Sequence, residues 1–126
     1  MTMNRILWAL QIFLGVYFIL VGAVHFIVPE GLPALMAWMY DLSPTLHMIS
    51  GTAEILGGLG LILPGLTGIQ PRLTPLAGIG LALVMVLAAG WHVQRGEVSN
   101  VPGNLLFGAL AAFVAYGRLR LQPLGE

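Results

Sequence analysis

Long apolar runs, broken by short polar stretches, dominate the sequence. The first run extends from Arg5 to Val28 and ends at Pro29-Glu30-Gly31. A helix needs about 20 apolar residues to cross the hydrocarbon of a bilayer, so this run is long enough for one membrane span. Pro and Gly directly after the run are typical helix-ending residues. The pattern therefore predicts a first membrane-spanning helix over residues 5–28.

Three further apolar runs each begin with a helix-start signal. Ser and Thr cap helix N-termini, and Pro is tolerated in the first turn because its missing N–H would have no partner there. These signals are Ser43-Pro44 for the second run, Thr74-Pro75 for the third, and Asn100 with Pro102 for the fourth. Pro64-Gly65 should end the second run. We expect the three spans at residues 44–63, 75–95 and 102–119.

The loops between these runs are short, which predicts an all-α fold: a four-helix up-and-down bundle within the membrane. Residues 1–126 should form a single membrane domain. Residues 32–42 are too short to cross the bilayer and contain Met36, Trp38, Met39 and Tyr40. Side chains of this kind favour the headgroup layer, so this segment predicts an interfacial turn or short helix.

Composition supports a lipid environment. Apolar residues make up 58% of the chain and charged residues 8%, and the mean hydropathy is +0.92. Four of the five arginines, Arg5, Arg72, Arg118 and Arg120, fall on the side that holds both termini. Because basic residues favour the cytoplasmic side of a membrane, both termini are predicted to be cytoplasmic. This rule accounts for Arg118 and Arg120 without any further role. The protein itself is expected in the cell membrane.

The residues that are missing exclude several functions. The chain has no Cys, which excludes thiolate metal sites, disulfides and dithiol redox chemistry. Any redox role therefore needs a bound cofactor. The formal net charge is +0, so the clustered basic residues of a nucleic-acid-binding protein are not expected.

Polar residues within the predicted spans gather toward the outer leaflet. They are His25, His47, Glu54, His92 and Asn104, and helical spacing places each on a stripe of small residues. Small residues mark the faces where membrane helices approach closely, so these stripes should face the bundle interior. The first two stripes are Gln11, Gly15, Gly22, His25 and His47, Gly51, Glu54, Gly58. The other two are Gly78, Ala82, Met85, Ala89, His92 and Asn104, Gly108, Ala111, Ala115, Arg118.

Glu54 is the strongest candidate for a functional residue. Placing an ionisable carboxyl in hydrocarbon costs about 2.5 kcal/mol or more, and such groups often mark a site or pathway. His25 and His92 could hydrogen-bond a quinone, share a proton with Glu54 or bind haem iron, and Asn104 could orient a ligand. Haem is the weaker idea because no attachment motif is present, and no metal site is expected. A structural role, in which the same polar groups only hold helices together, stays open.

Two other polar groups are expected to have no special role. His47 lies in the first turn of its helix and should be a solvated interfacial residue. Arg95 and Glu97 should form an exposed pair in the loop that precedes the fourth span.

The ordered motifs resemble the DoxX-like family of small four-helix membrane proteins. The motifs are the intramembrane G-x-x-E-x-x-G-G element at residues 51–58, the H-x-x-x-G-E turn at residues 92–97, Asn104 at the start of the fourth span, and the Tyr116-Gly117-Arg118 ending. They extend over nearly the whole chain. The resemblance implies a four-span fold with Glu54, His92 and Asn104 as motif positions, and His25 is added from topology.

DoxX and the related DoxD proteins are associated with membrane redox complexes, including quinone-coupled thiosulfate oxidation. Distant relatives are cargo receptors and a receptor chaperone, which are not enzymes. The leading hypothesis is therefore a subunit of a membrane redox complex that binds a quinone-like or amphipathic molecule near the outer leaflet. If it is enzymatic, it acts as an oxidoreductase-associated subunit with partners or a cofactor, with Glu54 and His92 as catalytic residues.

The alternative is a noncatalytic assembly, chaperone or partner-binding protein. In that case residues 36–40 would contact another membrane protein. A homo-oligomer is compatible with either hypothesis. A third possibility, a proton or solute conductor, would need polar residues in the cytoplasmic half, where only Gln11 is expected.

Overall fold

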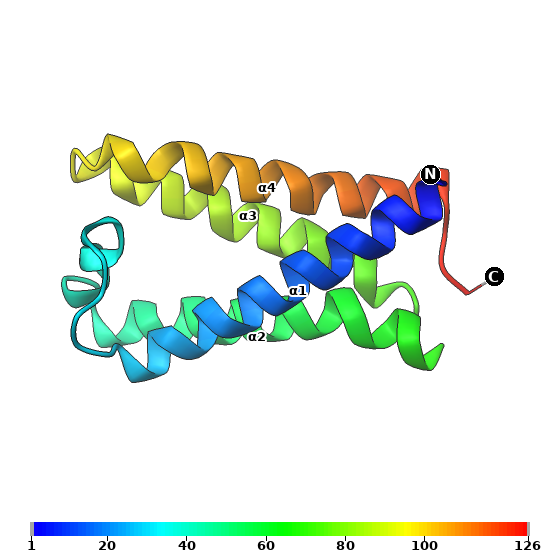
Figure 1. The fold of residues 1–126 in the computed structure, drawn as a ribbon, viewed down its shortest axis with the longest axis horizontal. Helices are drawn as coiled ribbons and strands as arrows, with labels where there is room; N and C mark the ends of the chain where they lie inside the picture. Colours follow the sequence, from blue (N-terminus) through cyan, green and yellow to red (C-terminus); the bar gives the residue numbers. More distant parts are fainter. Residues whose placement is uncertain (1, 126) are drawn as a thin grey trace.

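A computed structural model describes residues 2–125, and its long elements are all helices (Figure 1). The four main helices are α1 (Met3–Ile27), α2 (Pro44–Thr67), α3 (Leu73–Gln94) and α4 (Val101–Tyr116). Short helical segments are η1 (Ala34–Tyr40), η2 (Val98–Asn100) and η3 (Gly117–Leu121), which continues α4 as a π-helix. Four helical stretches of the described chain are long and apolar enough to cross a membrane, with η2, α4 and η3 together forming the last.

The helices run up and down, so the predicted four-helix architecture is confirmed. Helix α1 packs mainly on α2, and α3 mainly on α4. Figure 1 shows both termini at one end of the bundle, with η1 folded over the opposite end. We call these the terminal end and the η1 end. That the terminal end is cytoplasmic remains a prediction from the distribution of arginine.

The predicted stripes of small residues lie where the helices touch. A Cβ atom added to Gly58 would lie 2.6 Å from the carbonyl oxygen of Gly15, and one added to Gly51 would lie 2.9 Å from that of Gly22. Between α3 and α4, a Cβ on Gly78 would lie 2.7 Å from the carbonyl oxygen of Ala111. Side chains cannot fit at these distances, so glycine allows the helix backbones to approach closely.

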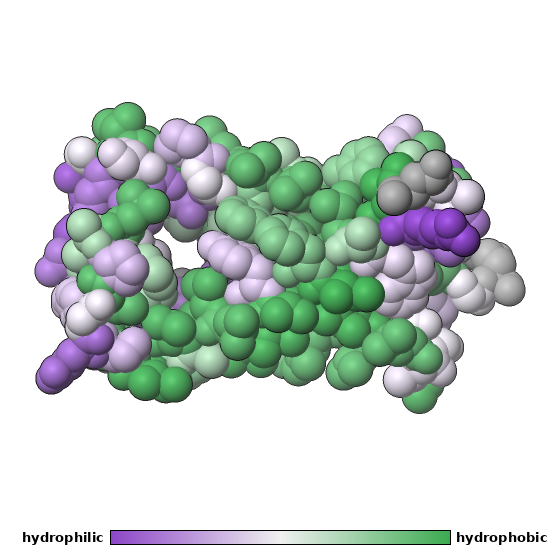
Figure 2. Space-filling model, in the orientation of Figure 1, coloured by the Kyte–Doolittle hydropathy of each residue, from purple (hydrophilic) through white to green (hydrophobic). Residues whose placement is uncertain are grey.

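The outer surface of the bundle is apolar between two polar ends. Figure 2 shows this apolar zone across the middle of the molecule, with hydrophilic residues at both ends. Large aliphatic side chains such as Leu20, Leu56 and Leu87 are more than half exposed. Water would disfavour so much apolar surface, whereas a bilayer solvates it. The protein is therefore a multi-pass membrane protein.

The second and third helices differ from their predicted limits. Helix α2 continues through Pro64 and ends at Thr67, where Gly68 adopts a left-handed conformation with φ 73°. Helix α3 begins at Leu73, so Thr74 is inside the helix and is not its N-cap. One hydrogen bond connects the two helices here. Pro64 cannot bond to the Gly60 carbonyl, and Thr74 Oγ1 donates a hydrogen bond to that carbonyl instead, at 2.8 Å.

The first helix ends close to its predicted limit. Helix α1 extends to Ile27, and Val28 follows in a left-handed conformation with φ 42° before the Pro29-Glu30-Gly31 turn. The segment 32–42 contains the 3₁₀ helix η1, as the pattern of interfacial residues predicted.

Candidate functional site

A cavity of about 260 Å³ lies inside the η1 end of the bundle. Helices α1 to α4 all contribute to its walls, and η1 covers it. Its polar lining includes all four predicted site residues: His25, Glu54, His92 and Asn104. The remaining lining is largely aliphatic and aromatic: Tyr17, Val21, Trp38, Leu42, Leu46, Ile49, Ser50, Ala53, Val84, Met85, Leu87, Ala88 and Trp91. The tertiary structure thus brings the predicted residues together around one small chamber.

Glu54 and His25 form the closest polar contact in the cavity. Glu54 Oε2 lies 2.9 Å from His25 Nε2, and both side chains are at least nine-tenths buried. The angles of this contact fall outside those of a regular hydrogen bond, so Glu54 Oε2 has no hydrogen-bond partner among the described residues. Pairing with imidazole lowers the cost of burying the carboxyl, but the oxygen can still bind another group.

Asn104 supplies a second unsatisfied group. Its Nδ2 atom is buried and has no hydrogen-bond partner among residues 2–125. Buried polar atoms nearly always have a partner, because leaving one unpaired costs about 1–3 kcal/mol. Two such atoms, one from α2 and one from α4, belong to residues that line the same cavity. A ligand with matching polar atoms would satisfy both.

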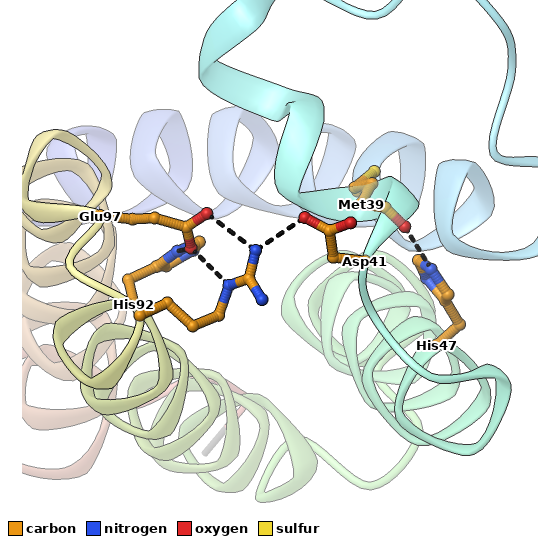
Figure 3. A network of polar contacts seen from close by, with 6 residues as sticks. Met39, Asp41, His47, His92 and Glu97 are labelled. Atoms are coloured by element: carbon orange, nitrogen blue, oxygen red, sulfur yellow. Dashed lines mark hydrogen bonds and ion pairs between the residues drawn. The ribbon is translucent and has the colours of Figure 1, made fainter.

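His47 is buried, so the expectation that it is a solvated interfacial residue was wrong. Its side chain is 9% exposed. The Nδ1 atom lies 2.9 Å from His25 Nδ1, and the Nε2 atom lies 2.8 Å from the backbone carbonyl oxygen of Met39 (Figure 3). The sequence placed His47 correctly in the first turn of α2 but did not reveal that η1 folds over that turn.

Segment η1 is held in place over the cavity. The Tyr40 hydroxyl donates a hydrogen bond to the Pro29 carbonyl and accepts one from the Leu32 backbone amide. Trp38 lies against both histidines of the cavity, with ring centroids 5.9 Å from His25 and 5.0 Å from His92. Its aromatic ring therefore bridges the two helix pairs.

The Arg95–Glu97 pair has a larger role than expected. Arg95 donates to Glu97 at 3.0 Å and to Asp41 at 2.7 Å, which links the α3–α4 loop to the end of η1 (Figure 3). The Arg95 guanidinium also lies over the Trp91 ring, 4.6 Å from its centroid. The expectation that this loop pair has no special role was wrong, because Asp41 approaches it only once the chain is folded.

Glu97 also fixes the orientation of His92. Its Oε1 atom lies 2.9 Å from His92 Nδ1. The Arg95 hydrogen bond, followed by the bond to His92, lowers the pKa of the Glu97 carboxyl. The ionised carboxylate can only accept, so His92 Nδ1 carries the proton in this contact. Neutral His92 then has an unprotonated Nε2 atom.

The donor geometry limits which cofactors the cavity can hold. His25 Nδ1 faces His47 and His25 Nε2 faces Glu54, which leaves neither nitrogen free to ligate haem iron. Among residues 2–125, no three His, Asp or Glu side chains converge in a group that could hold a metal ion. The polar groups are better arranged to bind an organic molecule by hydrogen bonds.

The walls of the cavity separate toward the η1 end. On the inner side, Tyr17 of α1 stacks on Phe107 of α4 with ring centroids 4.2 Å apart. Beyond this stack α1 and α4 diverge (Figure 1), and Figure 2 shows a hollow between the apolar zone and the η1 end. A lipid-soluble molecule could reach the cavity from the side.

The terminal end contains a polar cluster that the sequence analysis missed. Arg118 is 3% exposed and donates to Gln11 Oε1 at 2.6 Å, Asn4 Oδ1 at 2.8 Å and the Gln122 carbonyl at 2.9 Å. Gln11 in turn donates to the Leu61 carbonyl at 2.8 Å. Membrane topology alone therefore does not explain Arg118. Its place on the small-residue face of the fourth span, opposite Gln11, was the available signal.

A second hollow lies on the lipid-facing side of α2 and α3. Its volume is about 340 Å³, and its lining is apolar, including Gly57, Gly60, Leu73 and Leu81. It holds none of the titratable groups, so it offers no basis for chemistry.

Four apolar helices around a buried carboxyl–imidazole cavity define this chain as a small multi-pass membrane protein of the four-helix class. Residues 9–114 match the DoxX-like family, and the chain belongs to this family. The matched region includes every cavity residue named above, whereas Arg118 lies beyond it. No curated protein and no solved structure matches the chain.

Proposed function

We propose that the protein binds a small lipophilic molecule with a quinone-like head group in the cavity, as a subunit of a membrane redox complex. The observation that carries this proposal is the pair of buried, unpartnered polar atoms, Glu54 Oε2 and Asn104 Nδ2, in residues that line one cavity. In this role Glu54 accepts or donates a proton, His25 and His92 assist it, and Asn104 orients the ligand.

The size of the cavity favours a head group with an apolar tail. Pockets for drug-sized ligands measure about 300–1,000 Å³, and this cavity, at about 260 Å³, lies just below that range. A single ring with polar substituents fits this volume better than a large cofactor. The hollow that Figure 2 shows between the apolar zone and the η1 end leaves room for a tail to extend into lipid.

The polar groups of the cavity include both hydrogen-bond donors and acceptors for the oxygen atoms of a ring. Asn104 Nδ2 is a hydrogen-bond donor for a carbonyl oxygen, and Glu54 accepts from a hydroxyl when ionised or donates to a carbonyl when protonated. His92 Nε2, unprotonated when His92 is neutral, is a further acceptor. The cavity can therefore bind a quinone-like molecule both in its oxidised form, with carbonyl groups, and in its reduced form, with hydroxyl groups.

The redox context comes from the family resemblance. DoxX-like proteins are associated with quinone-coupled complexes, and this chain, which has no Cys, would need a partner to supply electrons. The distribution of arginine favours the cytoplasmic membrane with the cavity toward the outer leaflet. Partners would then be other membrane or redox proteins.

The test is to identify what the protein carries. The protein is purified in mild detergent, its visible spectrum is recorded, and organic extracts are analysed by mass spectrometry. We expect a quinone or related lipophilic compound that is lost in Glu54→Gln and in Asn104→Leu. Glu30→Gln is the matched control, because it makes the same chemical change at an exposed residue outside the cavity.

The noncatalytic alternative predicts a different result. Extracts would then contain only bulk lipid, and Glu54→Gln would leave any copurifying membrane protein in place. Added quinone analogues would also fail to shift the intrinsic fluorescence of Trp38 and Trp91. That combination would refute ligand binding in the cavity.

A further inference from the structure

Three titratable side chains form a continuous chain that starts at a backbone carbonyl and ends at the cavity. The Met39 carbonyl oxygen lies 2.8 Å from His47 Nε2, and His47 Nδ1 lies 2.9 Å from His25 Nδ1. His25 Nε2 lies 2.9 Å from Glu54 Oε2, close enough for an ion pair, although the angles are not those of a regular hydrogen bond. All three side chains are at least nine-tenths buried, and Glu54 and His25 line the cavity.

The carbonyl determines the protonation of the first histidine. A backbone carbonyl can only accept, so His47 Nε2 must carry a proton. Two facing ring nitrogens need one proton between them. When His47 is neutral its Nδ1 is therefore the acceptor, and His25 Nδ1 carries the proton. The fold thus selects one tautomer for each imidazole.

The last contact leaves one proton to be shared. With its Nδ1 protonated, His25 either is neutral, with its unprotonated Nε2 facing the O–H group of neutral Glu54, or is an imidazolium beside ionised Glu54. A third arrangement places the extra proton on His47 Nδ1 and leaves His25 protonated only at Nε2. All three arrangements contain the same three protons and have zero net charge.

We propose that His47, His25 and Glu54 form a proton relay that holds one mobile proton, with Glu54 as the end that faces the cavity. His25 passes the proton between its two ring nitrogens. His47 is a positioning residue, since it acts on the ligand only through His25. The Met39 carbonyl anchors the relay to η1.

Electrostatics favour this proton count. A buried cluster with zero net charge costs far less to place within a membrane than one with an unpaired charge. Of the other charged groups at this end, Arg95 pairs with Asp41 and Glu97, His92 pairs with Glu97, and Glu30 is exposed in the turn after α1. None of the described ion pairs places a positive charge from another residue beside Glu54. The negative charge of an ionised Glu54 is therefore balanced by a proton within the relay.

The relay deepens the proposed function and rests on it, because the cavity ligand is the partner for the mobile proton. When a bound oxygen accepts this proton, the Glu54 O–H bond breaks and a ligand O–H bond forms. The relay is then left with one negative charge. The relay regains zero net charge when Glu54 takes a proton back from a donor that reaches the cavity, such as the hydroxyl group of a reduced ligand.

Nitrogen-15 NMR of histidine-labelled protein in lipid nanodiscs, without added ligand, tests the relay directly. The chain has three histidines, so the signals lost in His92→Gln and those lost in His47→Leu together assign all three. We expect a proton on His47 Nε2 and a scalar coupling between the His25 and His47 Nδ1 atoms across their hydrogen bond. An unprotonated His47 Nε2, or the absence of this coupling, would overturn the proposal.

Infrared spectroscopy then shows whether the third proton of the relay is on Glu54. We expect either a carboxylic acid C=O band that is lost in Glu54→Gln or a doubly protonated His25 or His47. An ionised Glu54 beside two neutral imidazoles would mean that only two protons are present, which refutes the relay. The control Glu30→Gln should leave both the band and the histidine shifts unchanged.

His47→Leu separates positioning from packing. We expect this variant to lose the single His25 tautomer and to show a mixture of Nδ1–H and Nε2–H forms. A His25 that keeps its tautomer without His47 would show that His47 does not position it. If this variant does not fold, the scalar coupling and the number of protons in the unmodified protein still test the relay. Neither readout needs a bound ligand, so the relay and the proposed function can fail separately.

Discussion

Thr74 Oγ1 of α3 donates a hydrogen bond to the carbonyl oxygen of Gly60, which Pro64 leaves without its usual partner on α2. We predict that Thr74→Val destabilises the protein by about 1 kcal/mol, since side-chain hydrogen bonds between membrane helices contribute on this scale. Valine keeps the shape of threonine but cannot donate. Reversible unfolding in mixed SDS micelles measures the change.

A double-mutant cycle with Pro64→Ala isolates the cause of that effect. Alanine restores an N–H group that can bond to the Gly60 carbonyl within α2. Thr74→Val should then cost less in the Pro64→Ala background than in the unmodified protein. Equal costs in the two backgrounds would show that Thr74 acts through packing alone.

Arg118 joins η3 to α1 through two side chains, and a lysine cannot replace it. Lysine keeps the charge, but its ammonium group cannot reproduce the fork that serves Gln11 and Asn4 together. We predict that Arg118→Lys destabilises the protein by about 1–3 kcal/mol. The control is Arg120→Lys, two residues away and exposed, which should change the free energy of unfolding by no more than about 0.5 kcal/mol.

The Asp41–Arg95 contact should control how often η1 opens. Both side chains are substantially exposed, at 59% and 34%, so Arg95→Gln should reduce global stability by less than about 1 kcal/mol. Hydrogen–deuterium exchange of residues 34–41 should nevertheless accelerate, and high salt should accelerate it in the unmodified protein. Arg72→Gln, at the terminal end, should leave this exchange unchanged. Unaltered exchange in Arg95→Gln would contradict a role in holding η1.

Glu97 should make the loop between α3 and α4 sensitive to acid. Its carboxyl pKa is lowered from 4.5 by the hydrogen bonds from Arg95 and then His92. The stability that this ionised group contributes is present above pH 4.5 and is lost as the pH falls through the lowered value. Carbon-13 NMR of labelled glutamate, assigned with Glu97→Gln, measures the titration. A midpoint at or above 4.5 would contradict this prediction.

The shape of the cavity depends on packing at the helix interfaces, and that packing was largely predictable from the sequence. The small residues at 15, 22, 51, 58, 78 and 108 mark the helix faces that meet, because only small side chains allow close backbone approach in lipid. The same spacing placed His25, Glu54 and His92 on interior faces, and all three are buried. Helical periodicity was therefore sufficient to predict which side chains share the interior.

Contacts between distant segments could not be predicted in this way. His47 was expected to be solvated and Arg95 to have no special role, but His47 contacts η1 and Arg95 contacts Asp41, which directly follows η1. The path of a connecting segment depends on where its two helices end. A sequence pattern does not give the direction in which such a segment folds back.

The sequence by itself determined that the chain consists of four apolar helices, which faces of them turn inward and which ionisable groups they carry. These properties follow from hydropathy and from the helical repeat, which act within each segment. Only the tertiary structure decided that His25 lies between His47 and Glu54, that Thr74 compensates for Pro64, and that Arg118 donates to Gln11 and Asn4. Each of these is a contact between residues far apart in the chain, and the relative height and rotation of packed helices depend on all of their side chains at once.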